Sequence, residues 1–182
     1  MEQDLPAPAQ VVGFWRDAGP SRWFRRDAAF DARFRELFLP AHEAAAAGRL
    51  AGWRDSPEGA LALLLLLDQF PRNVFRGTPR VYAPDEPARA IADAAVRAGF
   101  DRQVEAELRQ FFYLPFMHSE ALDDLERCVA LNSELGGEPL RWARHHRDVV
   151  ARFGRFPHRN AVLGRESTPE EERFLAEGGF SG

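Results

Sequence analysis

Apolar residues recur every three or four positions through most of the chain, and no stretch alternates apolar and polar residues as a strand does. This spacing predicts helices, and the breaks between the apolar runs indicate about eight or nine of them. The connections are short, so consecutive helices are expected to pack as hairpins. The predicted fold class is therefore all-α, built from stacked antiparallel helix pairs.

The most apolar helix is predicted to begin at Ser56-Pro57-Glu58. Serine can accept a hydrogen bond from an unpaired N–H group, proline fits the first turn, and glutamate suits the positive end of the helix dipole. Leucine then occupies nearly every face over 61–67. Because a helix that is apolar all round must be buried all round, we expect the central helix here, ending at Pro71.

Two other prolines are expected to interrupt apolar runs. The segment 30–38 has the spacing of a helix that Pro40 breaks or kinks, with a separate helix over 42–47. Pro115 lies inside an aromatic run, so residues 112–117 are predicted to form a packed apolar connection.

The remaining helices are placed by their capping residues and apolar stripes. They are expected at 11–18, 85–99, 101–111, 119–135, 139–153 and from 167 onward. Asp101 and Ser119 are predicted to be N-caps. The glycine-rich segment from about 178 is predicted to be a loose tail.

The length of 182 residues suits a single helical domain over 1–182. The formal net charge of −4 gives no reason to expect nucleic acid as a partner. The longest apolar run, 60–67, is too short to span a bilayer, and Met1-Glu2-Gln3-Asp4 lacks the pattern of a signal peptide. We therefore expect a cytoplasmic protein without a membrane partner, and the oligomeric state stays open.

The chain contains no lysine, so all 24 basic residues are arginine. Schiff-base chemistry and a P-loop lysine are excluded, whereas arginine is suited to pairing with carboxylate or phosphate. The single Cys128 excludes an intramolecular disulfide and a CxxC zinc site. No cofactor motif occurs and the histidines are dispersed, so neither a cofactor nor a metal site is predicted.

Two segments echo each other: FPRN at 70–73 and FPHRN at 156–160. Each follows a predicted helix and places cationic and amide side chains just after a proline. This order of residues is typical of a folded polar site rather than of a surface loop. The ligand-binding candidates in these segments are Arg72, Asn73, His158, Arg159 and Asn160.

Asp68 lies just before the first of these segments, near the C-terminal end of the most buried helix. A carboxylate there faces the negative pole of the helix and needs a cationic partner if it is buried. Arg72 and Arg76 are the nearest candidates. Asp68 is either part of a structural ion pair or a general base, with Arg72 as the anion-binding group.

His118 and Glu120 flank the predicted cap Ser119. A helix N-terminus attracts anions and can lower the pKa of a histidine, and a neutral imidazole beside a carboxylate is a common acid–base arrangement. In the alternative interpretation, all three residues serve the helix end alone.

His145 and His146 are neighbours on the predicted helix 139–153, so their side chains point in different directions and cannot bind one metal together. His146 shares the apolar stripe of Trp142 and Val149. It is either a packed core residue or a catalytic group.

Arginines interleaved with phenylalanine and glycine make 152–165 the most basic loop of the chain. Glycine allows close approach of the backbone, so Arg155 and its neighbours could hold a phosphate or a carboxylate. Alternatively, these arginines form a C-terminal lock that neutralises Asp68, Glu120 and Asp148.

Three segments carry a likeness to known proteins: LLLLDQFPRNVFRGTPRVYAPD, FFYLPFMHSEAL and HHRDVVARFGRFPHRNAVLGRESTPEEERFL. Together they resemble a bacterial family of uncharacterised proteins, the domain of unknown function number 924, over most of the chain. The resemblance implies an all-helical fold similar to tetratricopeptide repeats. It implies no established activity and no catalytic residues. Where this chain has Leu125 the family often has glutamine, so no polar site is proposed at that position.

These features favour a protein that binds a small anionic molecule in one shared pocket and that could catalyse a hydrolytic or isomerising step. The catalytic candidates are Asp68, His118, Glu120 and His146. The ligand-binding candidates are Arg72, Asn73, Arg155, His158, Arg159 and Asn160. The alternative is a non-catalytic helical-repeat module whose groove binds a peptide or a partner protein.

Overall fold

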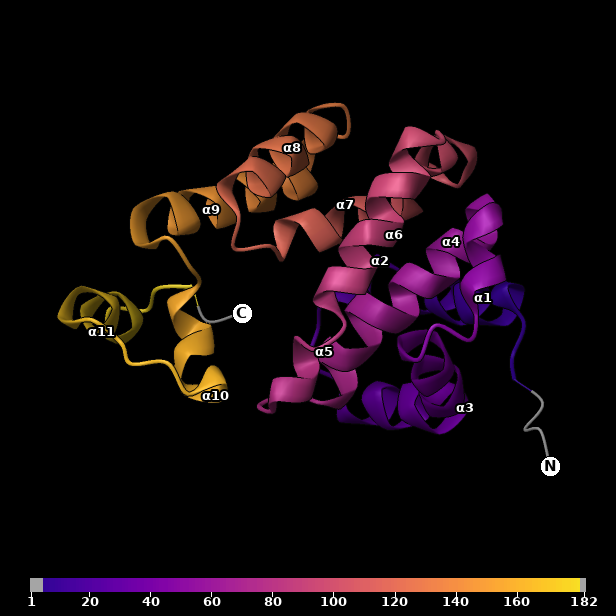
Figure 1. Cartoon of the computed structure of the whole chain (residues 1–182), viewed down its shortest axis with the longest axis horizontal. Coiled ribbons are helices and arrows are strands. Elements are labelled where there is room, and N and C mark those ends of the chain that lie inside the picture. Colours follow the sequence, from indigo (N-terminus) through magenta and orange to yellow (C-terminus); the bar gives the residue numbers. More distant parts are fainter. Residues whose placement is uncertain (1–4, 181–182) are drawn as a thin grey trace. The chain divides into compact units, whose positions relative to one another are not determined.

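The computed structural model describes residues 5–180, which form helices and no strand (Figure 1). This confirms the predicted all-α class. The first seven α-helices are α1 (Pro8–Ala18), α2 (Pro20–Trp23), α3 (Ala28–Ala46), α4 (Pro57–Leu64), α5 (Phe70–Val74), α6 (Asp85–Arg97) and α7 (Gln110–Met117). The others are α8 (Leu122–Ser133), α9 (Gly137–Phe153), α10 (Asn160–Leu163) and α11 (Pro169–Ala176).

Shorter helical turns join these helices. Five are 3₁₀ turns: η1 (Ala51–Asp55), η3 (Pro79–Val81), η4 (Phe100–Gln103), η5 (Ala106–Leu108) and η6 (Pro157–Arg159). The sixth, η2 (Leu65–Gln69), is a π-helical turn. None of the helices within residues 5–180 combines the length and the apolar character needed to cross a bilayer. The first four residues, on which the signal-peptide prediction depends, lie outside the described residues.

The chain divides into two compact units. Unit 1 comprises the residues up to 76 together with 80–115, and unit 2 comprises 77–79 together with the residues from 116 onward. The boundary falls inside α7. The single domain predicted over 1–182 stays a prediction, and each unit is described by itself.

Helix α4 and the π turn η2 form the centre of unit 1. Every residue over 59–71 is buried. Helices α1 and α6 pack against α4, while α3 and α6 pack against η2. The leucine-rich segment is therefore buried on all sides, as predicted. Its start is also as predicted, because the Ser56 hydroxyl accepts a hydrogen bond from the Gly59 N–H at 3.1 Å.

The prediction that this helix ends at Pro71 is wrong. The helical backbone continues from α4 through η2 into α5, and Pro71 lies in the first turn of α5. The reason is the π turn, in which the Phe70 N–H bonds the Leu65 carbonyl five residues back. This wider turn accommodates a residue that has no N–H to donate.

The other two prolines are also inside helices, contrary to prediction. Pro40 lies within α3, which runs without a break over 19 residues, and Pro115 lies within α7. An interior proline costs about 3 kcal/mol through its missing hydrogen bond and its steric clash. Helix α3 buries phenylalanine rings before its proline and alanines after it, whereas α7 buries large apolar side chains on both sides of its proline. This packing offsets the local loss.

The two predicted N-caps do not cap the helices expected of them. Asp101 lies inside η4, and its buried carboxylate accepts a hydrogen bond from the Tyr113 hydroxyl at 2.6 Å. Ser119 lies two residues before Ala121, the residue at the N-cap of α8. The Ser119 hydroxyl bonds the Ala121 N–H at 3.1 Å and Asp124 at 2.6 Å, so it holds the turn that leads into the helix.

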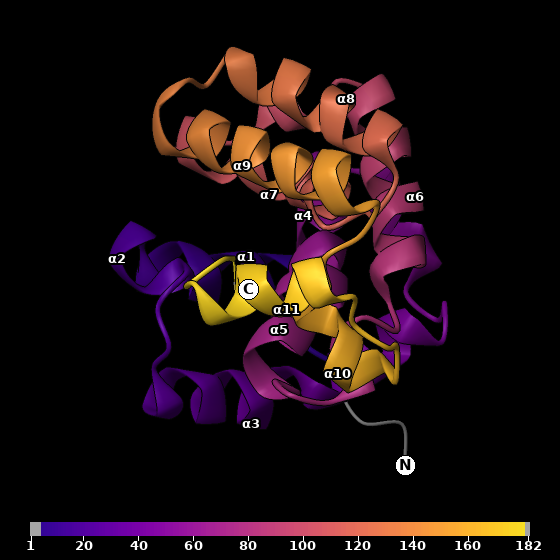
Figure 2. The same ribbon diagram turned by 90° about the vertical axis from the view of Figure 1, so that its left-hand side faces the viewer.

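Unit 2 is built on the helix pair α8 and α9, which lie side by side (Figure 2). Their apolar faces meet in a core of Leu125, Val149, Val150 and Phe156, against which Phe153, Phe174 and Phe180 pack. This pair fits the predicted antiparallel hairpins. The closer likeness to tetratricopeptide repeats remains an implication of the resemblance.

The segment after α11 differs from the predicted loose tail as far as residue 180. Gly178 has a φ of +81°, and a side chain at Gly179 would clash with the Phe174 carbonyl. These glycines turn the chain back, so the Phe180 ring packs against His146 with 4.5 Å between ring centroids. Ser181 and Gly182 lie outside the described residues.

Candidate functional site

In unit 1, the predicted site residues Asp68 and Arg72 form a closed ion-pair cluster. Asp68 is 1% exposed and accepts a hydrogen bond from the Gln69 amide at 2.7 Å. Arg72 lies 3.2 Å from Asp68 and binds Asp85 through two nitrogens at 2.8 and 3.0 Å. Burial opposes the charge of Arg72, but the two carboxylates outweigh it and raise the pKa of the guanidinium. This geometry pins α5 to the start of α6.

Asn73, the third predicted site residue of unit 1, contacts α3 instead. Its amide donates to the Asp31 carboxylate at 2.7 Å, and Arg76 pairs with the same carboxylate at 3.1 Å. These contacts hold α5 against α3, and they do not include the Asp68 cluster.

In unit 2, Glu120 is held by the loop that follows α9. Arg165 binds its carboxylate through two nitrogens at 2.7 and 2.9 Å, and the Phe156 N–H donates to it at 2.8 Å. Burial works against ionisation, but the Arg165 and Phe156 donors lower the pKa of Glu120 overall. Glu120 is therefore an ionised acceptor of three hydrogen bonds.

Arg155 and Asn160 meet at a second carboxylate, Glu171 of α11. Arg155 binds it through two nitrogens at 2.7 and 2.9 Å, and the Asn160 amide donates to it at 3.2 Å. The hydrogen bonds from Arg155 lower the pKa of Glu171 to about 2. Glu171 also closes a capping box with Thr168 at the start of α11. The arginines of 155–171 thus hold Glu171 and, through Arg165, Glu120, which is one of the partners named by the lock interpretation. Asp68 and Asp148, the other two, pair with Arg72 and Arg147 outside this loop.

His118, His146 and Arg159 are brought together in unit 2. The rings of His118 and His146 lie 6.3 Å apart, and Arg159 donates to the His118 carbonyl at 2.8 Å. Burial, followed by the proximity of His118, lowers the pKa of His146 to about 3. Phe180 packs against His146 and also against His158 at 4.9 Å.

The ten predicted site residues thus form local clusters, three residues in unit 1 and seven in unit 2. Their catalytic and ligand-binding roles stay predictions. Within the described part of the chain, no group of three or more His, Cys, Asp or Glu side chains is arranged to hold a metal ion.

A different histidine, which the sequence analysis did not select, has the geometry of a binding group. His42 lies on α3 and is 5% exposed. Its ring stacks on Phe70 with 4.7 Å between centroids, and its Nδ1 lies 2.8 Å from the Leu66 carbonyl oxygen of the π turn. A carbonyl can only accept, so Nδ1 carries the proton and donates it.

The Leu66 carbonyl needs this partner because of the π turn. In a π turn the partner lies five residues ahead, and for Leu66 that residue is Pro71, which has no N–H. The Phe70 N–H is already used by Leu65. His42 therefore fills the position that Pro71 leaves empty, since a buried carbonyl without a donor would be costly.

The other ring nitrogen of His42 is an open acceptor. No side chain or backbone group within residues 5–180 hydrogen-bonds to Nε2. Burial lowers the pKa of His42, although the bond to Leu66 works in the opposite direction. The ring is therefore neutral at physiological pH, with a lone pair on Nε2.

His42 lines a cleft of about 430 Å³ in unit 1. This volume lies within the range of small-molecule sites. Alanine and proline side chains form most of the walls, and two charged side chains complete them. The other lining residues are Glu43, Ala46, Ala47, Arg80, Ala83, Pro84 and Pro87.

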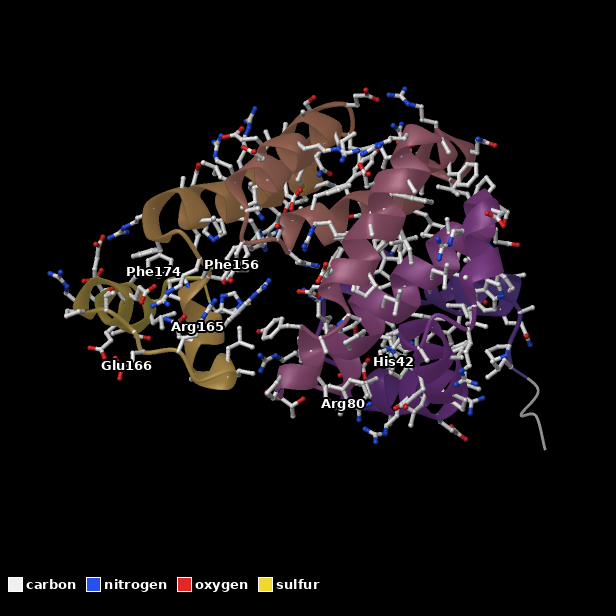
Figure 3. All side chains as sticks on the ribbon, viewed as in Figure 1. His42, Arg80, Phe156, Arg165, Glu166 and Phe174 are labelled. Carbon is white, nitrogen blue, oxygen red and sulfur yellow. The ribbon has the colours of Figure 1, made fainter. Side chains whose placement is uncertain are left out.

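The charged side chains of the cleft pair with each other. Arg80 donates to Glu43 Oε1 at 2.8 Å, and its guanidinium lies over the Phe75 ring at 3.8 Å from the centroid. Both partners are about half exposed. In Figure 3 the labelled His42 and Arg80 side chains both lie in the part of unit 1 beside α3. The cleft thus combines a neutral imidazole, a carboxylate and a guanidinium.

A second cleft in unit 1, of about 520 Å³, has a different chemistry. It lies between α1, the start of α4 and the segment 103–105, and Arg16 pairs with Glu105 across it at 2.7 Å. Its charged pair is about as exposed as the Arg80–Glu43 pair, but it contains no histidine. The His42 cleft is therefore the better candidate site.

The comparisons with known proteins place this chain in a family. A family model described as bacterial protein of unknown function (DUF924) matches residues 11–179. The chain belongs to the DUF924 family. No curated protein matches it.

A solved structure agrees closely with the DUF924 fold seen here. It is the protein of unknown function ATU0120 from Agrobacterium tumefaciens, with 55% sequence identity and a TM-score of 0.93. The match covers 94% of this chain and 97% of that one. The resemblance found in the sequence is confirmed, and the fold is shared over almost the whole length.

One sequence signal could have led to His42. Pro71 lies five residues after Leu66 inside a run of leucines that continues as helix. A proline in a buried helix leaves one carbonyl without a donor and calls for a polar partner from another element. That partner lies 24 residues away from Leu66 in the sequence, so periodicity alone does not identify it.

Proposed function

We propose that this protein binds a small organic molecule in the His42 cleft, with the His42 Nε2 accepting a hydrogen bond or a proton from it. One observation carries the proposal. A nearly buried imidazole has its Nδ1 fixed by the Leu66 carbonyl and its Nε2 unpaired, and the residue lines a cleft of suitable volume.

The same geometry suits proton transfer. A neutral imidazole with a fixed tautomer can take a proton at Nε2. The Leu66 carbonyl would continue to accept from Nδ1 in the charged ring, and Glu43 would favour that charge. This supports the predicted possibility of a hydrolytic or isomerising step, with His42 in place of the histidines of unit 2.

The ligand class predicted from the sequence was an anion. Arg80 is the group of this cleft that would bind an anion, and it would have to share its charge with Glu43.

The cytoplasmic location and the alternative of a peptide-binding module also stay predictions. The half-exposed Trp142 on α9 is the feature that would serve a protein partner.

Two substitutions of His42 separate its two nitrogens. In His42→Asn the amide nitrogen lies where Nδ1 was, so the bond to Leu66 is kept and the acceptor at Nε2 is lost. In His42→Gln the amide lies near the position of Nε2, so a polar group in the cleft is kept.

A library of small polar compounds tests the proposal by ring-nitrogen NMR of the histidines. We expect bound compounds to shift His42 Nε2, to lose binding in His42→Asn, and to retain part of it in His42→Gln. Compounds that bind His42→Asn as well as the wild type and leave the His42 ring signals unchanged would show that the cleft is not the site.

A further inference from the structure

The His42 cleft presents two side-chain hydrogen-bond acceptors on one wall. The His42 Nε2 is one acceptor. A second is Glu43 Oε2, because Arg80 contacts only Oε1 and no other partner of the Glu43 carboxylate lies within the described residues. Both acceptors come from consecutive residues in the last part of α3.

The end of α3 adds negative potential to the same wall. The N–H groups of residues 47, 48 and 49 donate hydrogen bonds to the carbonyls of Glu43, Ala45 and Ala44, in that order. The carbonyls of Ala46 and Ala47 consequently have no backbone donor among residues 5–180. The last turn of α3 also lacks a basic residue, so nothing on that turn itself offsets the negative pole of the helix.

The opposite wall has few donors to offer. Pro84 and Pro87 line it, and proline has no N–H group. The first turn of α6 carries Asp85 and Glu86, which offset the positive pole of that helix. The side-chain donor of the lining is Arg80, whose guanidinium donates to Glu43 Oε1 and lies over the Phe75 ring, so its charge is shared with Glu43.

We propose that the ligand of this cleft is a small primary amine, bound as its ammonium ion, with a short apolar body. This inference rests on the function proposed above and specifies its ligand class. The ammonium group has three donors and would bind Glu43 and the His42 Nε2. The apolar body would lie against the alanine and proline side chains of the walls.

Three probes of similar size test the ligand class: n-butylammonium, n-butanol and butyrate. Each carries a short alkyl chain, and they differ in the charge of the head group. Titration of the full chain, followed by the His42 ring nitrogens and by calorimetry, gives the three affinities at constant ionic strength. We expect butylammonium to bind about tenfold more tightly than either of the other two, because its hydrogen bonds are charge-assisted.

Two substitutions change the charge of the cleft in opposite senses. Glu43→Gln removes the carboxylate and is expected to weaken butylammonium binding about tenfold. Arg80→Gln removes the competing cation and is expected to leave butylammonium binding unchanged or to tighten it. Both residues are about half exposed, so both variants are expected to fold. A thermal melt checks this before the titrations.

The outcomes distinguish this inference from the proposed function. If butyrate binds most tightly and Arg80→Gln abolishes its binding, the cleft is an anion site and the amine inference is wrong, while the proposed function stands. If butanol binds as tightly as butylammonium and Glu43→Gln has no effect, the amine inference also fails. If all three probes leave the His42 ring unchanged and bind His42→Asn equally, both proposals are wrong.

Discussion

His42 in unit 1 and His146 in unit 2 are two buried imidazoles with the same local chemistry and different surroundings. Each has its Nδ1 2.8 Å from a backbone carbonyl, that of Leu66 for His42 and that of Trp142 for His146. Burial lowers the pKa of both rings. A fixed tautomer and a depressed pKa are thus found in both units and do not by themselves identify a site.

The difference lies in what surrounds each ring. His146 packs against aromatic and imidazole rings at centroid distances of 4.5 Å to Phe180, 5.6 Å to Phe156 and 6.3 Å to His118. His42 stacks on Phe70 but also lines a cleft. His42 donates to the carbonyl of Leu66, which belongs to another element. His146 donates to the carbonyl of Trp142, four residues earlier on its own helix. The two residues are similarly buried, at 5% and 7% exposed. What separates the proposed binding group from the core group is the cleft beside His42 and the source of the bonded carbonyl.

The largest expected effect is a loss of stability in acid caused by His146. The unfolded chain binds a proton here below about pH 6.5, but the folded protein excludes it down to about pH 3. The unfolded state therefore holds more protons in this window, and the free energy of unfolding falls as the pH drops through it. The full loss is on the order of 3–5 kcal/mol.

Urea denaturation between pH 7 and pH 4 measures this effect. We expect His146→Leu to lose less stability over this range than the wild type. The exposed neighbour His145 provides the comparison: it contributes a minor part of the lowering of the His146 pKa, so His145→Leu should depart from the wild-type curve far less than His146→Leu does. The titratable and charged groups that face His146 are His118, His145 and Arg159. If the free energy of unfolding of His146→Leu fell with pH in parallel with that of the wild type, the acid sensitivity would belong to other groups.

The second effect concerns the bond between His42 and Leu66. His42→Phe keeps a ring over Phe70 but leaves a buried carbonyl without a donor, which should lower the free energy of unfolding by about 1–3 kcal/mol. His42→Asn keeps a donor for the Leu66 carbonyl, so its free energy of unfolding should fall less than that of His42→Phe. Chemical denaturation of the two variants compares them. Equal losses would mean that Leu66 does not depend on the His42 proton.

The third effect concerns the ring that covers His146. Phe180→Ala should destabilise unit 2 by about 1 kcal/mol, because a partly buried aromatic side chain is lost. It should also let water reach His146 and raise the pKa of that ring from about 3. Titration of the histidine ring protons by NMR tests this, and a His146 pKa unchanged in Phe180→Ala would show that other side chains exclude the water.

The smallest effect is expected from Pro71→Ala. The new N–H at position 71 can donate to the Leu66 carbonyl and compete with His42. Stability should change by no more than about 1 kcal/mol, while the Nδ1 proton of His42 should exchange faster with water. An unchanged exchange rate in Pro71→Ala would show that the histidine bond does not depend on the missing donor.

The sequence predicts most of the helices because their ends are local. Ser56 accepts the expected backbone hydrogen bond at the start of α4, and α11 begins where a helix was expected. The burial of 61–67 follows from its composition. The prolines were misjudged because their effect depends on tertiary packing. Pro40 stays in a helix that buries one face before and after it, and Pro115 stays in a helix that is buried on both sides of it.

The candidate site was less predictable than the fold. Glu171 has no special feature in the sequence, yet it is the partner of Arg155 and Asn160. His42 lies on an alanine-rich helix end, and its importance follows from a carbonyl in a distant turn. Side chains from separate elements meet only through the tertiary fold, which the spacing of residues along one helix does not encode.

The π turn also sets the rotational phase of everything that follows it. It is equivalent to one residue inserted into a continuous α-helix, and each residue of such a helix advances by about 100°. Deleting a single leucine from 65–67 would let this segment close as a regular α-helix while α5 keeps its rotational position relative to α4. Phe70 would then stay over the His42 ring and Asn73 beside Asp31. An added leucine that continued as α-helix would instead rotate α5 by about 100°, so this leucine run tolerates a deletion better than an insertion.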